Sequence, residues 1–258
     1  MSVGVALGGG GVRGAAHIGV LREIRRAGLM PAAVAGTSSG ALIGALFCAG
    51  VDWSEVEATA RMLTPRQLWP RFRIGRRRLG LMQTVARWIG ETTTFEDLPI
   101  PLAVVAIDLC SGREIVYRSG PVLPALHAAV ALPPWLGPLW LQSGEALVDA
   151  GVLNRVPVDP LVGQVDRIVA VDVSGGGSVR GSRGSRRRRL GRAAVYRRIY
   201  ELAVERVTAL ALARAEVVLQ PAVGHISAFA MLRAGECIDA GARAFAESEE
   251  KLAALWAS

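Results

Sequence analysis

The sequence predicts an α/β fold in which helices cover a mostly parallel central sheet. Short apolar segments alternate with longer segments of helical periodicity: residues 3–7 predict a buried strand, 15–26 a helix, 33–35 a second strand and 38–49 a second helix. Glycine-rich turns join each strand to the helix that follows it. Strand–helix–strand units of this kind place their strands parallel.

The rest of the chain continues this alternation. It predicts strands at residues 102–107, 114–117, 146–148, 167–173 and 216–220, and helices at 54–62, 79–89, 122–130, 192–213 and 228–257. The strand at 114–117 follows Ser111-Gly112 and is expected to return as a hairpin. We expect one domain over residues 1–258, with 175–191 as a surface loop rich in glycine, serine and arginine.

The composition indicates a globular protein with a large apolar core. With 258 residues, 51% apolar and 20% charged, the chain can bury a large core and is not disordered. The cysteines Cys48, Cys110 and Cys237 are odd in number and far apart, so we expect no disulfide framework and no metal site. No apolar run is long enough to span a membrane, and residue 3 already enters a strand without a signal segment. We therefore expect a cytoplasmic protein.

The most informative stretch is Gly36-Thr37-Ser38-Ser39-Gly40, which lies between the second strand and the second helix. A serine with glycines two positions to either side is typical of a nucleophile elbow, a turn so tight that the serine backbone is strained. The alternative is an ordinary turn in which Ser38 caps the helix.

The earlier glycine cluster also admits two interpretations. Gly9, Gly11 and Gly14 match a dinucleotide-binding fingerprint, but the second strand ends without the carboxylate that would bind a ribose. Alternatively, bare amides at the start of a helix stabilise an oxyanion. A serine nucleophile at the end of the neighbouring strand favours the oxyanion interpretation, so no cofactor is expected.

A serine nucleophile needs a base. The three histidines, His17, His127 and His225, are not predicted at a junction between a strand and a loop, and His17 is expected to be buried or to cap a helix. Asp149 ends a strand and precedes Ala150-Gly151, whose small size allows close approach. The alternative is a turn aspartate.

Taken together, three motifs resemble those of the patatin-like phospholipase family: Gly9-Gly10-Gly11-Val12-Arg13-Gly14, Gly36-Thr37-Ser38-Ser39-Gly40 and Asp149-Ala150-Gly151. The resemblance extends over about residues 3 to 173. It implies a three-layer α/β/α fold and hydrolysis of lipid acyl esters without metal or cofactor. The chain departs from the family pattern at Ala150, where glycine is common, and at residues 128–133.

By position, the resemblance makes Ser38 the nucleophile and Asp149 the base. It assigns the oxyanion hole to the amides of Gly9, Gly10 and Gly11. Arg13 is expected to hold the glycine loop in shape, with contact to an anionic part of the substrate as the alternative. The glycines Gly14, Gly36, Gly40 and Gly151 complete the motifs. A catalytically silent protein that keeps the fold as a lipid-binding scaffold is the competing interpretation.

Two further segments bear on lipid access. The apolar, proline-stiffened segment 133–141 precedes Asp149, and we expect its Trp135 and Trp140 to line the acyl site. Nine arginines lie between Arg180 and Arg198, and they are expected to contact anionic membrane. No aromatic residues are interleaved in the manner of a nucleic-acid site, so nucleic acid is not an expected partner. The basic segment 61–78 is expected to be solvated, with a membrane-facing flap as the alternative.

Overall fold

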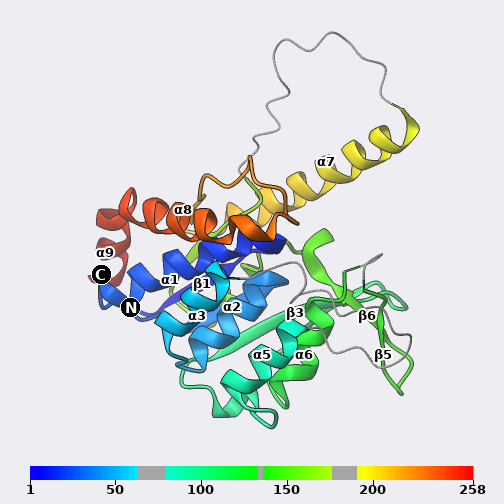
Figure 1. The fold of residues 1–258 in the computed structure, drawn as a ribbon, viewed down its shortest axis with the longest axis horizontal. Coiled ribbons are helices and arrows are strands. Elements are labelled where there is room, and N and C mark those ends of the chain that lie inside the picture. Colours follow the sequence, from blue (N-terminus) through cyan, green and yellow to red (C-terminus); the bar gives the residue numbers. More distant parts are fainter. Residues whose placement is uncertain (63–79, 133–135, 176–190, 258) are drawn as a thin grey trace.

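In the computed structural model, residues 1–62, 80–132, 136–175 and 191–257 are described (Figure 1). Their strands form one eight-stranded sheet in the order β5-β6-β3-β2-β1-β7-β8, with β4 paired to β3. The strands are β1 (Val3–Leu7), β2 (Ala33–Thr37), β3 (Leu102–Asp108), β4 (Arg113–Tyr117), β5 (Leu139–Trp140), β6 (Ala146–Asp149), β7 (Arg167–Val171) and β8 (Val217–Leu219).

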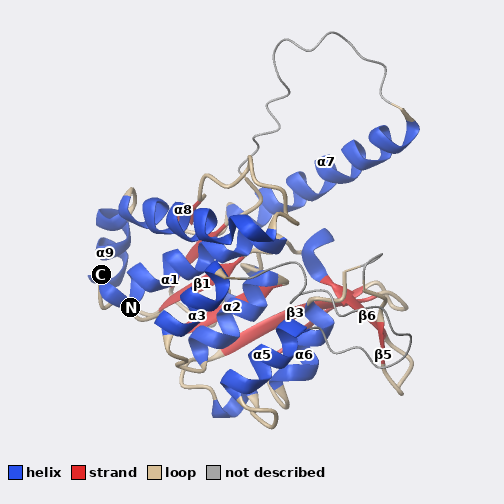
Figure 2. Cartoon of the chain, in the orientation of Figure 1, coloured by secondary structure: helices blue, strands red, loops and turns tan. Residues whose placement is uncertain are grey.

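Helices surround this sheet (Figure 2). They are α1 (Ala16–Arg26), α2 (Ser39–Cys48), α3 (Trp53–Arg61), α5 (Gly80–Ile89), α6 (Val122–Ala129), α7 (Arg192–Leu212), α8 (Ala234–Ala246) and α9 (Glu249–Ala257). Short 3-10 helices include η1 (Gly11–Ala15), η3 (Ala150–Val152), η4 (Asp159–Leu161) and η5 (Met231–Arg233). No helix among the described residues is long and apolar enough to cross a membrane.

The sheet is mostly parallel, as the sequence predicts. Strands β3, β2, β1, β7 and β8 run parallel to their neighbours, whereas β4 and β6 pair antiparallel with β3, and β5 pairs antiparallel with β6. The hairpin predicted at residues 114–117 is confirmed as β3–β4. The two-residue strand β5 was not predicted, because it is too short to show an alternating pattern.

The two faces of the sheet bury different side chains. Alternate residues of β1 point to opposite faces, so Val3, Val5 and Leu7 join the large core beneath α1, α2, α3, α5, α6 and α8. On the other face, Ala6 and Ala35 pack with η4 and with the C-terminal end of α7. The small alanines allow this second layer to lie close, which gives the predicted three layers.

The first and last thirds of the chain meet where α1 packs against α8. A Cβ atom at Gly19 would lie 2.0 Å from the carbonyl oxygen of Ile238, and one at Gly241 would lie 2.0 Å from that of Ala16. The backbones of the two helices are therefore too close for any side chain at these positions.

This close packing predicts that adding a methyl group at Gly241 destabilises the protein. Gly241→Ala is expected to lower the free energy of unfolding by about 2 kcal/mol, because overpacking outweighs the gain in helix propensity. Gly235→Ala in the same helix is the control: its Cβ would meet only the flexible end of Arg61, at 2.9 Å. Urea denaturation measures both. Equal stability of the two variants would contradict the close contact.

Candidate active site

The pairing of β3 brings the predicted serine and aspartate together. Strand β4 covers one edge of β3 from Val104 to Asp108, so β2 and β6 must share the opposite edge. On that edge β2 ends with Thr37 opposite Val105, and β6 ends with Asp149 opposite Ala106. The two strands therefore end against each other, and Ser38 follows directly after Thr37.

Ser38 has a strained backbone. Its φ is 54° and its ψ is −122°. Among the described residues, Ser38 is the only one other than glycine with a positive φ. The flanking glycines are required by space: a Cβ at Gly36 would lie 2.5 Å from the Cα of Ala41, and one at Gly40 would lie 2.1 Å from the oxygen of Leu7. The Ser38 side chain does not cap α2. The ordinary capped turn is therefore not the observed arrangement.

Asp149 is buried, with 4% of its surface exposed, and Oδ1 accepts a hydrogen bond of 2.7 Å from the Gly151 N–H. Burial raises the pKa of this carboxyl above its ordinary value. A hydrogen bond from the Ser38 hydroxyl, the Gly151 N–H and the positive charge of Arg155 oppose that rise in pKa. Ser38 thus lies close enough to Asp149 to act on its pKa, and both residues line the same cavity.

The glycine loop lies against this pair, and a Cβ at Gly9 would lie 3.1 Å from the Cβ of Ser38. The three amides predicted for the oxyanion hole differ in their partners. The Gly9 N–H donates to the carbonyl of Arg155 at 2.9 Å and is therefore occupied. The Gly10 N–H donates to Ser39 Oγ at 3.1 Å. The Gly11 N–H has no acceptor among the described residues.

Ser39 was not predicted as a site residue. Its hydroxyl joins the elbow to the glycine loop, and a Cβ at Gly14 would lie only 2.3 Å from Ser39 Oγ. Gly14 is therefore needed to leave room for the Ser39 side chain. The sequence shows a second hydroxyl directly after Ser38. Its partner, the Gly10 N–H, lies in the glycine loop, and only the fold brings the two together.

Arg13 attaches the glycine loop to the C-terminal part of the chain. Its guanidinium donates to the carbonyls of Ile226 at 2.5 Å, Ser174 at 2.7 Å and Gly224 at 3.5 Å. The Val12 N–H adds a bond of 2.8 Å to the carbonyl of Ala228. Arg13 thus has the contacts of a residue that keeps the loop in shape. We call the accepting carbonyls of Gly224, Ile226 and Ala228 the C-terminal clamp.

The histidines contact other groups. His17 is fully buried, as expected, with Nε2 2.7 Å from the carbonyl oxygen of Gly8, while its buried Nδ1 has no partner. Because a carbonyl only accepts, Nε2 carries the proton. His225 lies on the surface and pairs with Glu236 at 2.6 Å. His127 lies on α6.

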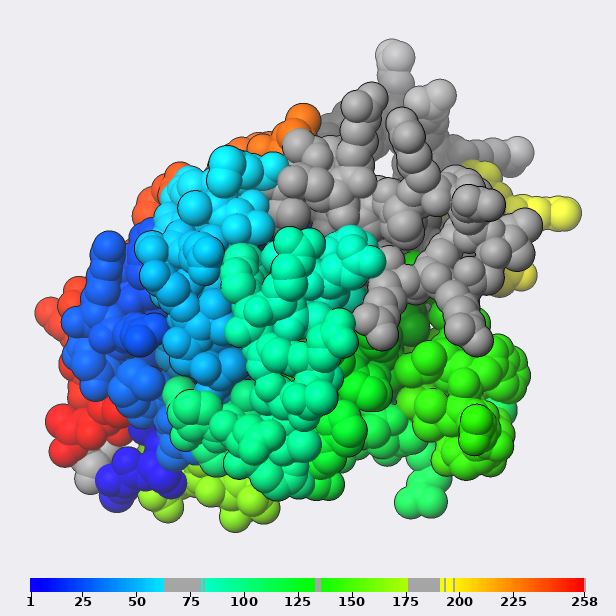
Figure 3. Space-filling model, turned by 60° about the horizontal axis from the view of Figure 1, so that its bottom comes forward, coloured from blue at the N-terminus to red at the C-terminus, as the bar shows by residue number. Residues whose placement is uncertain are grey.

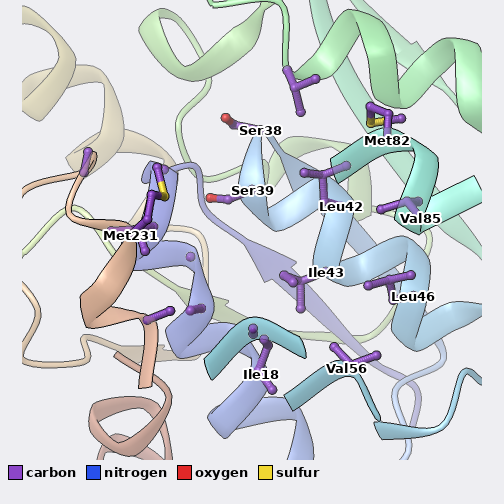
Figure 4. A pocket seen from close by; sticks show the side chains of 18 of the residues that line it. Ile18, Ser38, Ser39, Leu42, Ile43, Leu46, Val56, Met82, Val85 and Met231 are labelled. Atoms are coloured by element: carbon purple, nitrogen blue, oxygen red, sulfur yellow. The ribbon is translucent and has the colours of Figure 1, made fainter. Parts of the chain in front are cut away.

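An apolar cavity of about 230 Å³ begins at Ser38, Ser39 and Asp149 (Figure 4). Leu42, Ile43 and Leu46 of α2 form one wall. Further lining residues include those of α1 (Ile18), α3 (Val56, Thr59, Ala60), α5 (Met82, Val85, Trp88) and the segment before α8 (Ala228, Phe229, Met231). On the outer surface of the protein, α3 and α5 lie side by side (Figure 3).

The cavity corrects part of the sequence prediction. Of the segment 133–141, Leu136 lines the cavity, whereas Trp140 is 68% exposed and does not. Trp135 lies outside the described residues, as do residues 63–78 of the predicted basic segment. The walls from α3 and α5 were not foreseen, since amphipathic periodicity does not say what a helix packs against. No group of three metal-ligating side chains occurs in the described parts of the chain.

Comparison with known proteins identifies the family. The profile of the Patatin-like phospholipase family matches residues 5–162, which is more than half of the chain. The chain belongs to the patatin-like phospholipase family. The matched part contains the glycine loop, the Ser38 elbow and Asp149, and it ends before α7, α8 and the C-terminal clamp.

Relatives with known sequences share this part. An uncharacterized NTE family protein of Mycobacterium tuberculosis is 34% identical over 179 residues, which cover 67% of this chain and 49% of that protein. Neuropathy target esterase sws of Drosophila melanogaster is 32% identical, over 67% of this chain and 13% of its own length. This patatin-like chain thus spans about half the length of its mycobacterial relatives. The crystal structure of VipD from Legionella pneumophila aligns with a TM-score of 0.45 and 13% identity, over 66% of this chain and 49% of that one.

The buried His17 predicts a pH effect on stability. Burial lowers its pKa to about 4, against 6.5 in the unfolded chain. As the pH falls from 6.5 towards 4, the unfolded chain takes up a proton at this residue that the folded protein does not, so the folded state loses about 3 kcal/mol. His17→Gln keeps a donor for Gly8 and does not titrate. Denaturant unfolding of both proteins between pH 7 and 4 should show the stability difference moving by that amount in favour of the variant. A constant difference would contradict the buried neutral histidine.

Proposed function

We propose that this chain hydrolyses carboxylic esters of lipids, with Ser38 as nucleophile and Asp149 as its base. The observation that carries the proposal is the placement of Ser38 beside the buried carboxyl of Asp149, at the mouth of an apolar cavity that both residues line. Membership of the patatin-like phospholipase family and the name of the Drosophila relative, an esterase, support the same class of reaction.

The reaction proceeds in two half-reactions. Ser38 Oγ attacks the ester carbonyl while Asp149 accepts its proton, and the proton then passes to the leaving alcohol as the acyl–serine ester forms. Water, deprotonated by Asp149, attacks that ester in turn and releases the fatty acid and free Ser38. The raised pKa of Asp149 makes it a stronger base than an exposed aspartate, while the groups that oppose the rise favour its ionised form.

Backbone amides would stabilise the oxyanion of each tetrahedral intermediate. The Gly11 N–H has no acceptor among the described residues and is the first candidate, and Gly10 is the second once Ser39 Oγ yields its place. The Ser39 N–H, at the start of α2, is a third donor of the kind that follows a nucleophile in an elbow. One such donor contributes about 3 kcal/mol to lowering the barrier.

The cavity indicates the acyl part of the substrate. From Ser39 to Leu46 the wall formed by α2 rises about 10 Å, since an α-helix rises 1.5 Å per residue. Apart from Ser38, Ser39 and Asp149 at the mouth, the side chains that line the cavity are apolar except for Thr59. A fatty acyl chain would therefore be bound by burial of its methylene groups at about 0.8 kcal/mol each.

The enzyme and scaffold interpretations make different predictions for Ser38. Ser38→Ala is expected to abolish labelling by a fluorophosphonate probe and to reduce esterase turnover at least about a thousandfold, because no other group replaces the nucleophile. Asp149→Asn should reduce turnover similarly. Ser248→Ala, between α8 and α9, is the matched serine control. Labelling of wild type that persists in folded Ser38→Ala would refute the assignment, and a wild type that neither labels nor turns over would favour the scaffold.

We further propose that α7 contacts anionic membrane. Its surface is unusually apolar for a solvated helix: Tyr196 is 75% exposed and Ile199 58% exposed, three positions apart on one side of the helix. In Figure 1 this helix projects from the body of the protein. Arg192 and Arg198 belong to the predicted arginine-rich segment, whose residues 180–190 lie outside the described ones. Apolar and basic residues together are typical of a helix at a lipid surface.

Vesicle sedimentation tests this contact. Wild type is expected to pellet with vesicles of phosphatidylcholine and phosphatidylglycerol more than with phosphatidylcholine alone, and less so at high salt, because the attraction is screened. Tyr196→Asp with Ile199→Asp should weaken pelleting. Met30→Asp is the control, because Met30 is an exposed apolar residue at the end of the sheet where β2 begins, outside α7. Equal pelleting with both kinds of vesicle would refute electrostatic docking.

A further inference from the structure

Two arginines lie at the glycine loop: Arg13 is part of it, and Arg155 is bonded to it through its backbone. The two side chains differ in their partners. The guanidinium of Arg13 is occupied by three carbonyl oxygens. The guanidinium of Arg155 makes no hydrogen bond and no ion pair with any described residue. Its positive charge nevertheless acts to lower the pKa of Asp149, of Arg13 and of Tyr200 in α7. An arginine without a partner, next to the reacting groups, has five donors available for a ligand.

The backbone of Arg155 is fixed in place at the site. Its carbonyl accepts the Gly9 N–H at 2.9 Å, and the carbonyl of the preceding Asn154 accepts Thr37 Oγ1 at 2.9 Å. The segment is thereby tied both to the glycine loop and to the end of β2. The Arg155 side chain is half-buried, so it is attached to a fixed backbone and still reaches solvent.

The position of Arg155 relative to the cavity suggests which part of a substrate it would meet. Asp149 lines the apolar cavity, whereas Arg155 does not. With the acyl chain in the cavity and the ester carbonyl at Ser38, the alcohol part of the ester must leave the cavity mouth past Asp149. Arg155 is held at the glycine loop outside the cavity, and its charge reaches Asp149, so it is available to an alcohol part that leaves past Asp149.

We propose that Arg155 binds the phosphate of an acyl ester substrate and so makes the enzyme selective for anionic lipid headgroups. The inference rests on the proposed function. A guanidinium matches a phosphate with two parallel N–H···O bonds, which are stronger than bonds between neutral groups. Arg155 is then a specificity-determining residue, and Arg13 is not, because its donors are already used.

The kinetic test compares two esters with the same acyl chain, 1-octanoylglycerol 3-phosphate and 1-octanoylglycerol. At a pH well above the acid limb of the profile, Arg155→Gln is expected to raise KM for the phosphate ester about tenfold or more, and to leave kcat/KM for the neutral ester within about twofold. Arg155→Lys should restore part of the loss. Arg26→Gln, at the exposed end of α1, is the control. An equal loss for both esters, or none for the phosphate ester, would overturn the proposal.

The pH profile gives a second readout. Because the positive charge of Arg155 lowers the pKa of Asp149, Arg155→Gln should move the acid limb of the kcat/KM profile for the neutral ester to higher pH. Ser38 and the Gly151 N–H, the other groups that act on the pKa of Asp149, are unchanged in this variant, and Tyr200 remains in place. A shift without any change in headgroup selectivity would mean that Arg155 only tunes the base, which would overturn phosphate binding.

A binding measurement keeps the test independent of turnover. In Ser38→Ala protein, octyl phosphate is expected to raise the thermal unfolding temperature, and Arg155→Gln in the same background should abolish that rise. The effect of 1-octanol should be the same in both proteins. Inorganic phosphate at equal concentration should give no rise. A rise with inorganic phosphate as large as that with octyl phosphate would show a site for free phosphate and overturn the assignment to a lipid headgroup.

If Ser38 proves not to be the nucleophile, the octyl phosphate result still decides whether Arg155 binds the anion. Failure of the proposed reaction and failure of the phosphate site therefore give different results.

Discussion

The site depends on how strands are distributed along the two edges of β3. Because β4 occupies one edge over Val104–Asp108, β2 and β6 must follow one another along the other. This arrangement places Ser38, just after β2, against Asp149, the last residue of β6. A slip of β6 by a single residue would turn the Asp149 side chain to the opposite face. The proposed chemistry therefore depends first on the register of β2 and β6 along β3, which places Ser38 next to Asp149.

The environment of Asp149 combines opposing effects. Burial favours the neutral acid, whereas Ser38, the Gly151 N–H and Arg155 favour the carboxylate. Two of these three are needed for other purposes: Ser38 is the proposed nucleophile, and Arg155 the proposed phosphate ligand. When a phosphate binds Arg155, its negative charge offsets the positive one, and Asp149 becomes a stronger base. Headgroup binding and proton transfer would then be linked through one carboxylate.

Much of this arrangement could be predicted from sequence, because its determinants are local. The glycines around Ser38 and the strand ending at Asp149 need only short-range steric arguments, and every strand of the parallel part of the sheet was foreseen. The cavity walls could not be foreseen. Met82, Val85 and Trp88 predict an amphipathic helix, but the partner of its apolar side is set by tertiary packing. Ser39 and Arg155 were missed for the same reason, since their importance lies in contacts with other loops and in the lack of a partner.

The C-terminal clamp has a consequence for when activity can begin. The glycine loop is synthesised well before the carbonyls of Gly224, Ile226 and Ala228 that fix it, because these lie about 210 residues further along the chain. Contacts between such distant segments form late in folding. We expect a nascent chain that already carries Ser38 and Asp149 to lack a shaped glycine loop until residues 224–228 have been synthesised and have packed against it. The proposed ester hydrolysis could thus begin only after this late segment has been made, so the order of synthesis itself would delay activity.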